Sequence, residues 1–131
     1  MYPSRTVIVA IARPLQRVYA FLAEPRNLPR WASGPLANYH QVSAHEWEAD
    51  GPVRIQFTPV NRFGVIDFSI TPSSMLSQMT PARVYTNGEG AEVAITLFQR
   101  EGISDEQFAS NCAWMEADLQ VLKTYLESLE P

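Results

Sequence analysis

The chain has 131 residues, of which 46% are hydrophobic and 18% are charged, the composition of a globular protein that buries a core. A formal net charge of −4 disfavours binding to nucleic acids, and the only cysteine, Cys112, excludes an intramolecular disulfide. We therefore expect a single domain over residues 1–131, with no nucleic-acid partner.

The N-terminal segment predicts a β-strand rather than a targeting or membrane segment. Residues 1–5 lack the charged-then-apolar order of a signal peptide, and the apolar run that follows is far shorter than the ~20 residues that span a bilayer. Val7, Val9 and Ile11 show the period of two that is typical of a half-buried strand, here from Arg5 to Ala12. We expect a cytoplasmic protein without a membrane span.

Two short helices are predicted next. Pro14 suits the first turn of a helix, where its missing N–H costs nothing, and apolar residues at helical spacing continue from Leu15 up to Pro25. Further prolines break the following stretch into brief turns that are anchored by Leu28 and Trp31. This stretch predicts a second short helix followed by a loop.

From Tyr39 to Ala94 the pattern changes to short strands separated by turns. A strand over residues 53–57 follows the turn Asp50-Gly51, and a strand from Phe63 to Ile70 follows Val60-Asn61. Adjacent antiparallel strands are the natural interpretation of this spacing.

The strongest hairpin signal is Asn87-Gly88 with Gly90. Glycine accepts positive φ at low cost, and the flanking segments, residues 83–86 and 92–98, are rich in strand-forming residues. The last two strands should therefore pair across this turn.

A long helix is predicted from Ser104 onward. Ser104 is a hydroxyl N-cap, acids follow in the first turn, and Gln107 completes a capping box. Apolar residues then recur in steps of four and three, which gives the helix one continuous apolar stripe. This spacing also suits a coiled coil. The apolar face of the preceding strands, however, favours packing of the helix on the sheet. The stripe consists of Phe108, Cys112, Met115, Leu119, Leu122, Leu126 and Leu129.

Four local motifs resemble a known superfamily. They are Arg13-Pro14 through residues 18–22 with Asn27-Leu28-Pro29-Arg30-Trp31, then Phe63-Gly64-Val65-Ile66-Asp67, then Arg83-Val84 with Asn87-Gly88-Glu89-Gly90, and finally Thr96-Leu97-Phe98 with residues 118–123. On these motifs the chain resembles the START-like or SRPBCC superfamily, especially its polyketide cyclase/dehydrase-like branch. The resemblance implies an α+β helix-grip fold: a curved antiparallel sheet wrapped around a long C-terminal helix, with two short helices after the first strand.

The chain departs from the pattern of that branch at three places. Phe68 stands where a His follows the Asp of the Gly-Val-x-Asp segment, Gln99 separates Thr-Leu-Phe from Arg100, and Asn111 takes a place that is usually acidic. These departures count against a shared reaction.

Large apolar side chains are concentrated where a helix-grip pocket would be lined, and such pockets are the usual sites of small ligands. Buried aromatics also commonly fill a core, so both interpretations stay open for Phe57, Phe68 and Phe98, whereas a pocket role is favoured for Trp31. The candidate ligand-binding residues are Trp31, Trp47, Phe57, Phe68, Phe98, Phe108 and Met115.

Asp67 and Arg83 are the candidate polar groups of such a pocket. A buried Asp67 could act as an acid or base, and an inward Arg83 could hold a ligand carboxylate. Strand alternation instead favours an Asp67 that faces solvent or pairs across strands, and an exposed Arg83.

No metal or cofactor site is predicted. Strand alternation places His40 and His45 on opposite faces, so the two cannot share a metal ion. Cys112 lies on the buried stripe of the last helix, where an apolar environment suppresses thiol reactivity. No catalytic residue can be named.

The leading hypothesis is a protein that binds a small hydrophobic or aromatic molecule in an internal cavity with at most one or two inward polar groups. One alternative is a polyketide cyclase/dehydratase-like enzyme, which needs a positioned acid or base inside the cavity. The other is an interaction protein with a vestigial cavity, and a homodimer is a candidate assembly.

Overall fold

The computed structural model describes residues 1–34 and 36–130. In chain order the elements are β1 (Ser4–Ile11), α1 (Leu15–Ala23), the 3₁₀ helix η1 (Pro25–Arg30), β2 (His40–Gln41), β3 (Glu46–Ala49), β4 (Val53–Phe57), β5 (Phe68–Pro72), β6 (Ala82–Asn87), β7 (Gly90–Phe98) and α2 (Asp105–Ser128).

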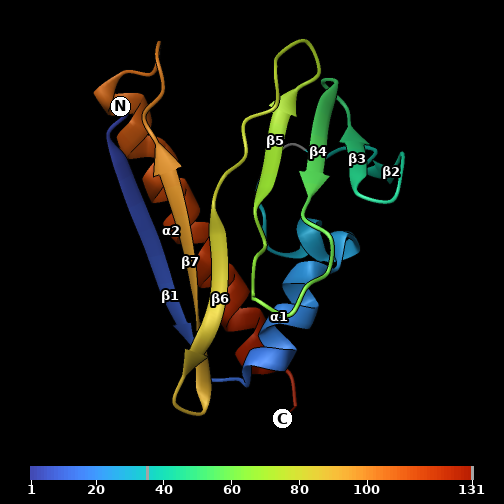
Figure 1. Cartoon of the computed structure of the whole chain (residues 1–131), viewed down its shortest axis with the longest axis vertical. Helices are drawn as coiled ribbons and strands as arrows, with labels where there is room; N and C mark the ends of the chain where they lie inside the picture. Colours follow the sequence, from blue (N-terminus) through green and yellow to red (C-terminus); the bar gives the residue numbers. More distant parts are fainter. Residues whose placement is uncertain (35, 131) are drawn as a thin grey trace.

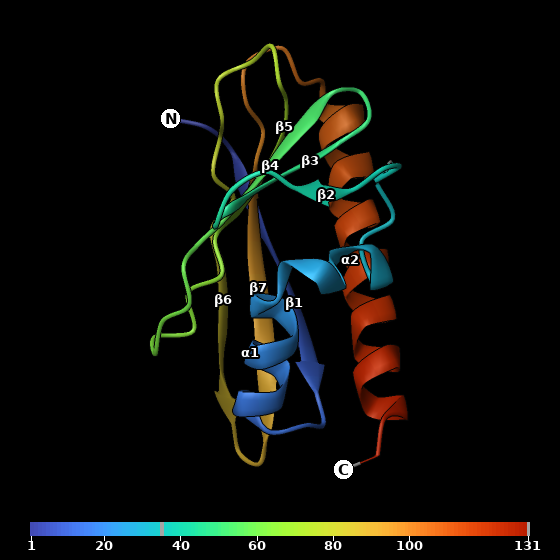
Figure 2. The same ribbon diagram turned by 90° about the vertical axis from the view of Figure 1, so that its right-hand side faces the viewer.

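The strands form two antiparallel sheets, with orders β1-β7-β6 and β2-β3-β4-β5 (Figure 1). Isolated bridges between Val65 and Arg83 and between Phe68 and Thr80 connect the second sheet to the first. The long helix α2 runs beside β1 (Figure 2), while α1 packs against β6 and β7 and, with η1, lies below β4 in Figure 1. This is the α+β helix-grip architecture that the sequence predicts.

The main core lies between the first sheet and the C-terminal half of α2. Val7 of β1 is opposite Ile95 of β7, and both are buried, as the period of two predicts. Leu119 and Leu122 cover this face and are about 1% and 0% exposed. The predicted stripe is therefore confirmed at its centre, whereas Phe108 is half-buried and lies outside this core, and Leu129 follows the end of α2 and is 36% exposed.

A smaller core supports the second sheet. Trp47 and Ile55 are buried there, and Tyr39 stacks on Trp47 with ring centroids 4.6 Å apart. The Tyr39 hydroxyl donates to the carbonyl oxygen of Pro25 at 2.8 Å, and burial raises the pKa of Tyr39. Trp31 packs against both cores and so joins η1 to each.

The local signals for the hairpin and the last helix are confirmed. Asn87 pairs with Gly90 across a two-residue turn in which Gly88 has a φ of +59°. The Ser104 hydroxyl accepts the backbone N–H of Gln107 at 3.0 Å, so it caps α2 as predicted.

The strand predicted from Phe63 to Ile70 is wrong at its start, because β5 begins at Phe68 and continues to Pro72. Gly64 has a φ of +70°, and a Cβ there would lie 2.1 Å from the carbonyl oxygen of Val84. Only glycine fits this close approach, which places the segment before β5 against β6 without a continuous ladder.

Polar contacts tie the C-terminal end of α2 to the end of β1. Lys123 Nζ donates to the carbonyl oxygen of Ala10 at 2.7 Å and pairs with Glu127 at 2.8 Å. The Glu127 carboxylate also accepts the backbone N–H of Ala12 at 2.7 Å, and Arg13 donates to the backbone carbonyl of Glu127 at 2.6 Å. Hydrogen bonds from Lys123 and from the Ala12 amide lower the pKa of Glu127.

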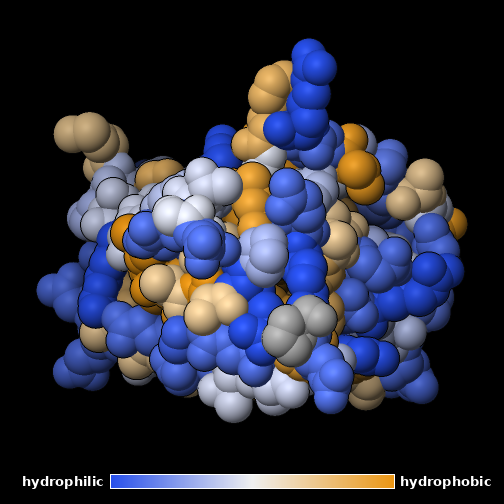
Figure 3. Space-filling view, turned by 90° about the horizontal axis from the view of Figure 1, so that it is seen from below, coloured by the Kyte–Doolittle hydropathy of each residue, from blue (hydrophilic) through white to orange (hydrophobic). Residues whose placement is uncertain are grey.

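The end of the molecule that carries the β6–β7 hairpin is mainly hydrophilic, with hydrophobic residues in smaller patches (Figure 3). Within residues 1–34 and 36–130, no helix combines the length and the hydropathy that crossing a bilayer requires.

Leu119→Ala should lower the free energy of unfolding by about 2–5 kcal/mol, because it leaves a cavity between α2 and the sheet. Val121→Ala is the control: that side chain is 49% exposed, so its truncation should cost less than about 0.5 kcal/mol. Urea denaturation measures both, and a Leu119→Ala loss below about half a kcal/mol would contradict this packing.

Glu127→Gln should lower stability at neutral pH and have a smaller effect in acid. The folded-state pKa of Glu127 lies below its usual value of 4.5, so its carboxylate stabilises the fold above that value and this contribution is lost as pH falls through the lowered pKa. Urea denaturation of both proteins at about pH 7 and about pH 3.5 measures the difference. A difference that grows on acidification would show that the contacts of Glu127 do not favour its ionised form.

Candidate functional site

An open groove of about 530 Å³ lies between β5, the segment after it, η1 and the N-terminal half of α2. Phe68, Ile70 and Pro72 line one wall from β5. The other wall comes from α2 and consists of Asn111, Trp114, Met115 and Asp118, while Trp31, Leu97 and Arg100 line the space between.

The β5 wall is apolar because strand alternation turns Ile70 toward the groove. Its neighbour Ser69 is on the opposite face, where it is buried and donates to the side-chain oxygen of Gln56 at 3.2 Å. Ile70 pairs in register with the buried Ile55 but is itself 46% exposed. The inward face of the second sheet is therefore covered at Ile55 and uncovered at Ile70.

The α2 wall is held by contacts to the segment after η1. Trp114 Nε1 donates to the Ser33 hydroxyl, and the Asp118 carboxylate accepts the Ser33 backbone N–H at 3.3 Å. Even so, the Trp114 side chain stays 54% exposed, so its ring contributes an accessible aromatic surface to the groove.

A separate small cavity of about 30 Å³ lies deeper in the molecule, with Phe57, Ile66 and Ile95 among its lining residues. This is room for about one water molecule. Trp31 and Phe68 line both this cavity and the groove. The enclosed interior is therefore nearly filled, whereas the groove offers space that could accept a ligand.

The structure brings together three of the seven ligand-binding residues that the sequence predicts, namely Trp31, Phe68 and Met115. Phe57 lines only the small cavity, and Trp47 is 7% exposed within the second core. Phe98 lies beneath the guanidinium of Arg100, and Phe108 is half-buried near the start of α2. Neither of these two phenylalanines lines the groove.

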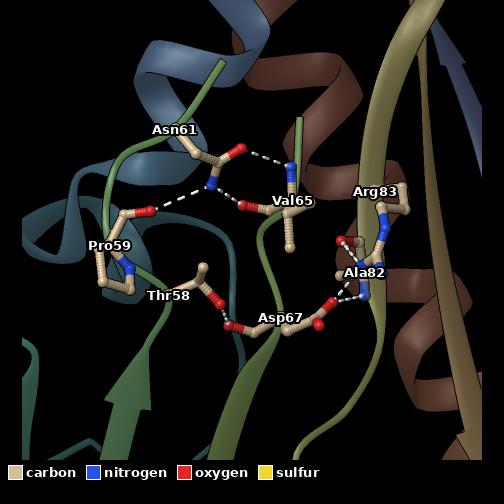
Figure 4. A network of polar contacts seen from close by, with 7 residues as sticks. All are labelled: Thr58, Pro59, Asn61, Val65, Asp67, Ala82 and Arg83. Carbon is tan, nitrogen blue, oxygen red and sulfur yellow. Dashed lines mark hydrogen bonds and ion pairs between the residues drawn. The ribbon is translucent and has the colours of Figure 1, made fainter. Parts of the chain in front are cut away.

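Asp67 and Arg83 do not line the groove. They lie next to each other on neighbouring segments (Figure 4). The Asp67 carboxylate accepts the backbone N–H of Ala82 at 2.8 Å and pairs with the Arg83 guanidinium. Since Ala82 and Val84 on either side of Arg83 are buried, Arg83 points away from the core. The cross-strand pair favoured by alternation is confirmed, and the structure corrects the suggestion that these two residues are polar groups of the pocket.

Asn61 organises the loop that leads to this pair (Figure 4). Its side-chain amide donates to the carbonyl oxygens of Pro59 and Val65 at 3.0 and 2.9 Å, and its side-chain oxygen accepts the Val65 backbone N–H at 3.2 Å. The Asn61 backbone N–H donates to the Tyr19 hydroxyl at 2.8 Å. This polar network is structural, because it satisfies backbone groups in a segment without a ladder.

Sequence reasoning missed Ile70, Trp114 and Asp118 as groove residues. Trp114 lies off the apolar stripe of α2, and a large aromatic at an otherwise exposed helical position is a signal that could have found it. The groove also holds more polar side chains than the one or two expected of a carrier. They are Gln78, Thr80, Arg100, Asn111 and Asp118.

No protein-family model and no curated protein matches the sequence. Solved structures do match. XoxI from Bacillus cereus is 15% identical, with a TM-score of 0.72 and 98% of each chain covered. Ara h 8.0201 is 10% identical, with a TM-score of 0.71 over 98% of this chain and 100% of its own.

Two further matches come from CalU16 of Micromonospora echinospora and from DynU16, a protein in the dynemicin biosynthetic locus. CalU16 is 12% identical, with a TM-score of 0.69 over 98% of this chain and 76% of its own. DynU16 is 15% identical, with a TM-score of 0.66, and the match spans 95% of this chain but only 47% of DynU16. At such identities the matches establish the helix-grip fold, and thereby confirm the START-like resemblance at the level of fold.

Asp67→Asn and Arg83→Met should each leave the affinity for a groove ligand within about tenfold of wild type, or about 1.4 kcal/mol, because neither side chain reaches the groove. Fluorescence titration with the neutral dye N-phenylnaphthylamine measures this affinity, and urea denaturation of each variant controls for stability. A larger loss of affinity at unchanged stability would show that these residues take part in ligand binding and would favour an enzyme.

Proposed function

We propose that this protein binds a small hydrophobic or aromatic molecule in the groove between β5 and α2. The observation that carries this proposal is apolar surface left uncovered on the lining of the groove. Ile70, Met75 and Trp114 are 46%, 55% and 54% exposed and all line it. Its volume of about 530 Å³ lies within the roughly 300–1,000 Å³ that is usual for small-molecule sites.

The energetics favour an apolar occupant. Each Å² of apolar surface removed from water contributes about 25 cal/mol, so a ligand that covers both Ile70 and Trp114 gains stability on both walls at once. The contacts of Ser33 with Trp114 and Asp118 hold one wall in place before binding, which lowers the ordering cost.

A polyketide cyclase/dehydratase-like enzyme is the second candidate, and the occurrence of DynU16 in a biosynthetic locus supports it. Against it, Asp67 and Arg83 lie outside the groove, and the groove carboxylate, Asp118, forms no ion pair within the described residues. The two acid–base candidates named from the sequence are therefore absent from the groove, and Asp118 is the carboxylate on its lining that could serve as an acid or base.

An interaction protein with a vestigial cavity is the third candidate. The nearly filled interior cavity of about 30 Å³ favours it, whereas the much larger groove beside this cavity favours a ligand. A homodimer and a cytoplasmic location stay predictions of the sequence.

Ile70→Trp should weaken binding of N-phenylnaphthylamine by about tenfold or more, because the larger ring fills the space that the dye would occupy. Ile8→Trp is the matched control: Ile8 is 54% exposed on β1 and does not line this groove, so the substitution should leave the affinity unchanged. Fluorescence titration should give saturation near one dye per chain for the wild type. A wild type that binds no dye, or equal weakening by both variants, would refute the groove as the site.

A further inference from the structure

Arg100 is a cation on the lining of the groove. It follows β7 by two residues, and its guanidinium lies 5.4 Å from the ring centroid of Phe98 and 5.8 Å from that of Tyr2. The two rings stabilise the charge through the faces of the guanidinium, but its N–H donors lie at the edge of that plane.

The edge donors of Arg100 have no acceptor among the residues that the structure describes. Of the nine arginines in the sequence, six donate to an oxygen within the chain. The other three are Arg17, Arg62 and Arg100, and Arg100 is the one of these that lines the groove. Its charge is thus placed beside apolar surface without a partner in residues 1–34 and 36–130.

Within the described residues, no acid forms an ion pair with Arg100. Asp105 accepts the side-chain amide of Gln99 at 2.8 Å, and Glu101 is exposed. Asp118, also on the groove lining, accepts the Ser33 amide and forms no ion pair with Arg100. Along α2, Asp118 lies seven residues beyond Asn111, about 10.5 Å further along the helix axis. The carboxylate and the Asn111 amide therefore lie at different heights on the α2 wall.

Asn111 adds a second donor on the α2 wall. Its side-chain oxygen accepts from Gln107 at 2.8 Å, which leaves the side-chain NH₂ of Asn111 to donate. A guanidinium and an amide donor on one groove, with apolar walls beside them, suit an anionic group attached to an apolar body.

We propose that the ligand is an organic acid: an aromatic or aliphatic body that covers Ile70 and Trp114, with a carboxylate or sulfonate bound by Arg100. This inference rests on the proposed function, since it concerns the same groove. Charge-assisted hydrogen bonds to a guanidinium are stronger than neutral ones, so the acidic group should raise affinity even though the whole chain carries a net charge of −4.

The test uses two probes that share one skeleton and differ in the acidic group: neutral N-phenylnaphthylamine and anilinonaphthalene sulfonate. Arg100→Gln should weaken binding of the sulfonate by about tenfold and leave binding of the neutral probe unchanged, which also shows that the fold is intact. Arg62→Gln is the matched control, since Arg62 likewise lies over an aromatic ring, that of Phe63 at 5.5 Å, but does not line the groove.

The outcomes separate the two proposals. A selective loss for the sulfonate in Arg100→Gln, absent from Arg62→Gln, supports the acid-binding role. If Arg100→Gln leaves sulfonate binding unchanged, or if Arg62→Gln weakens it as much, Arg100 does not select the anion, while binding of the neutral probe would still support the groove. If the wild type binds neither probe, both proposals are wrong.

Discussion

The packing of α2 on the β1-β7-β6 sheet is the contact on which the rest of the structure depends. Leu119 and Leu122 lie at its centre, and the Lys123–Glu127 network fixes the C-terminal end of the helix against the end of β1. Because the apolar stripe and the sheet face are both continuous there, no space for a ligand opens between the C-terminal half of α2 and this sheet. The open space between α2 and the second sheet is instead displaced toward the N-terminal half of the helix.

That displacement creates the groove. The second sheet has a separate small core around Trp47 and Ile55, and isolated bridges connect it to the first sheet. Its β5 strand therefore faces the N-terminal half of α2 without packing fully against it, and Ile70 stays accessible. Trp31 contacts both cores and lines both the filled cavity and the open groove, so it marks the boundary between structural packing and a candidate binding surface.

The chemistry of the groove differs from that of the outer face of the sheet. Asp67 and Arg83 pair with each other, and Asp67, Arg83 and Asn61 each bond to nearby backbone groups, so they stabilise an irregular segment and are not available for a ligand. Arg100 has aromatic rings around it and no acceptor among the described residues. A cation in that situation selects an anion, whereas one that is already paired does not. The structural matches support the fold without naming a ligand. The proposed function therefore rests on the side chains that line the groove.

Local patterns in the sequence predict most of the elements, since alternation in β1, the Asn87-Gly88 turn and the Ser104 cap each act within a few residues. They also place Leu119 in the core and pair Asp67 across strands. Only the tertiary structure decided which aromatics face open space: Trp47 and Trp31 are both candidate ligand-binding residues in the sequence, but Trp47 is covered by Tyr39 and Trp31 lies at the edge of both cores. The exposure of Ile70 depends on how far the second sheet lies from α2, and the lack of an acceptor for Arg100 among the described residues depends on which side chains surround the end of β7. That separation is set by contacts between residues distant in the chain, which neither periodicity nor composition encodes.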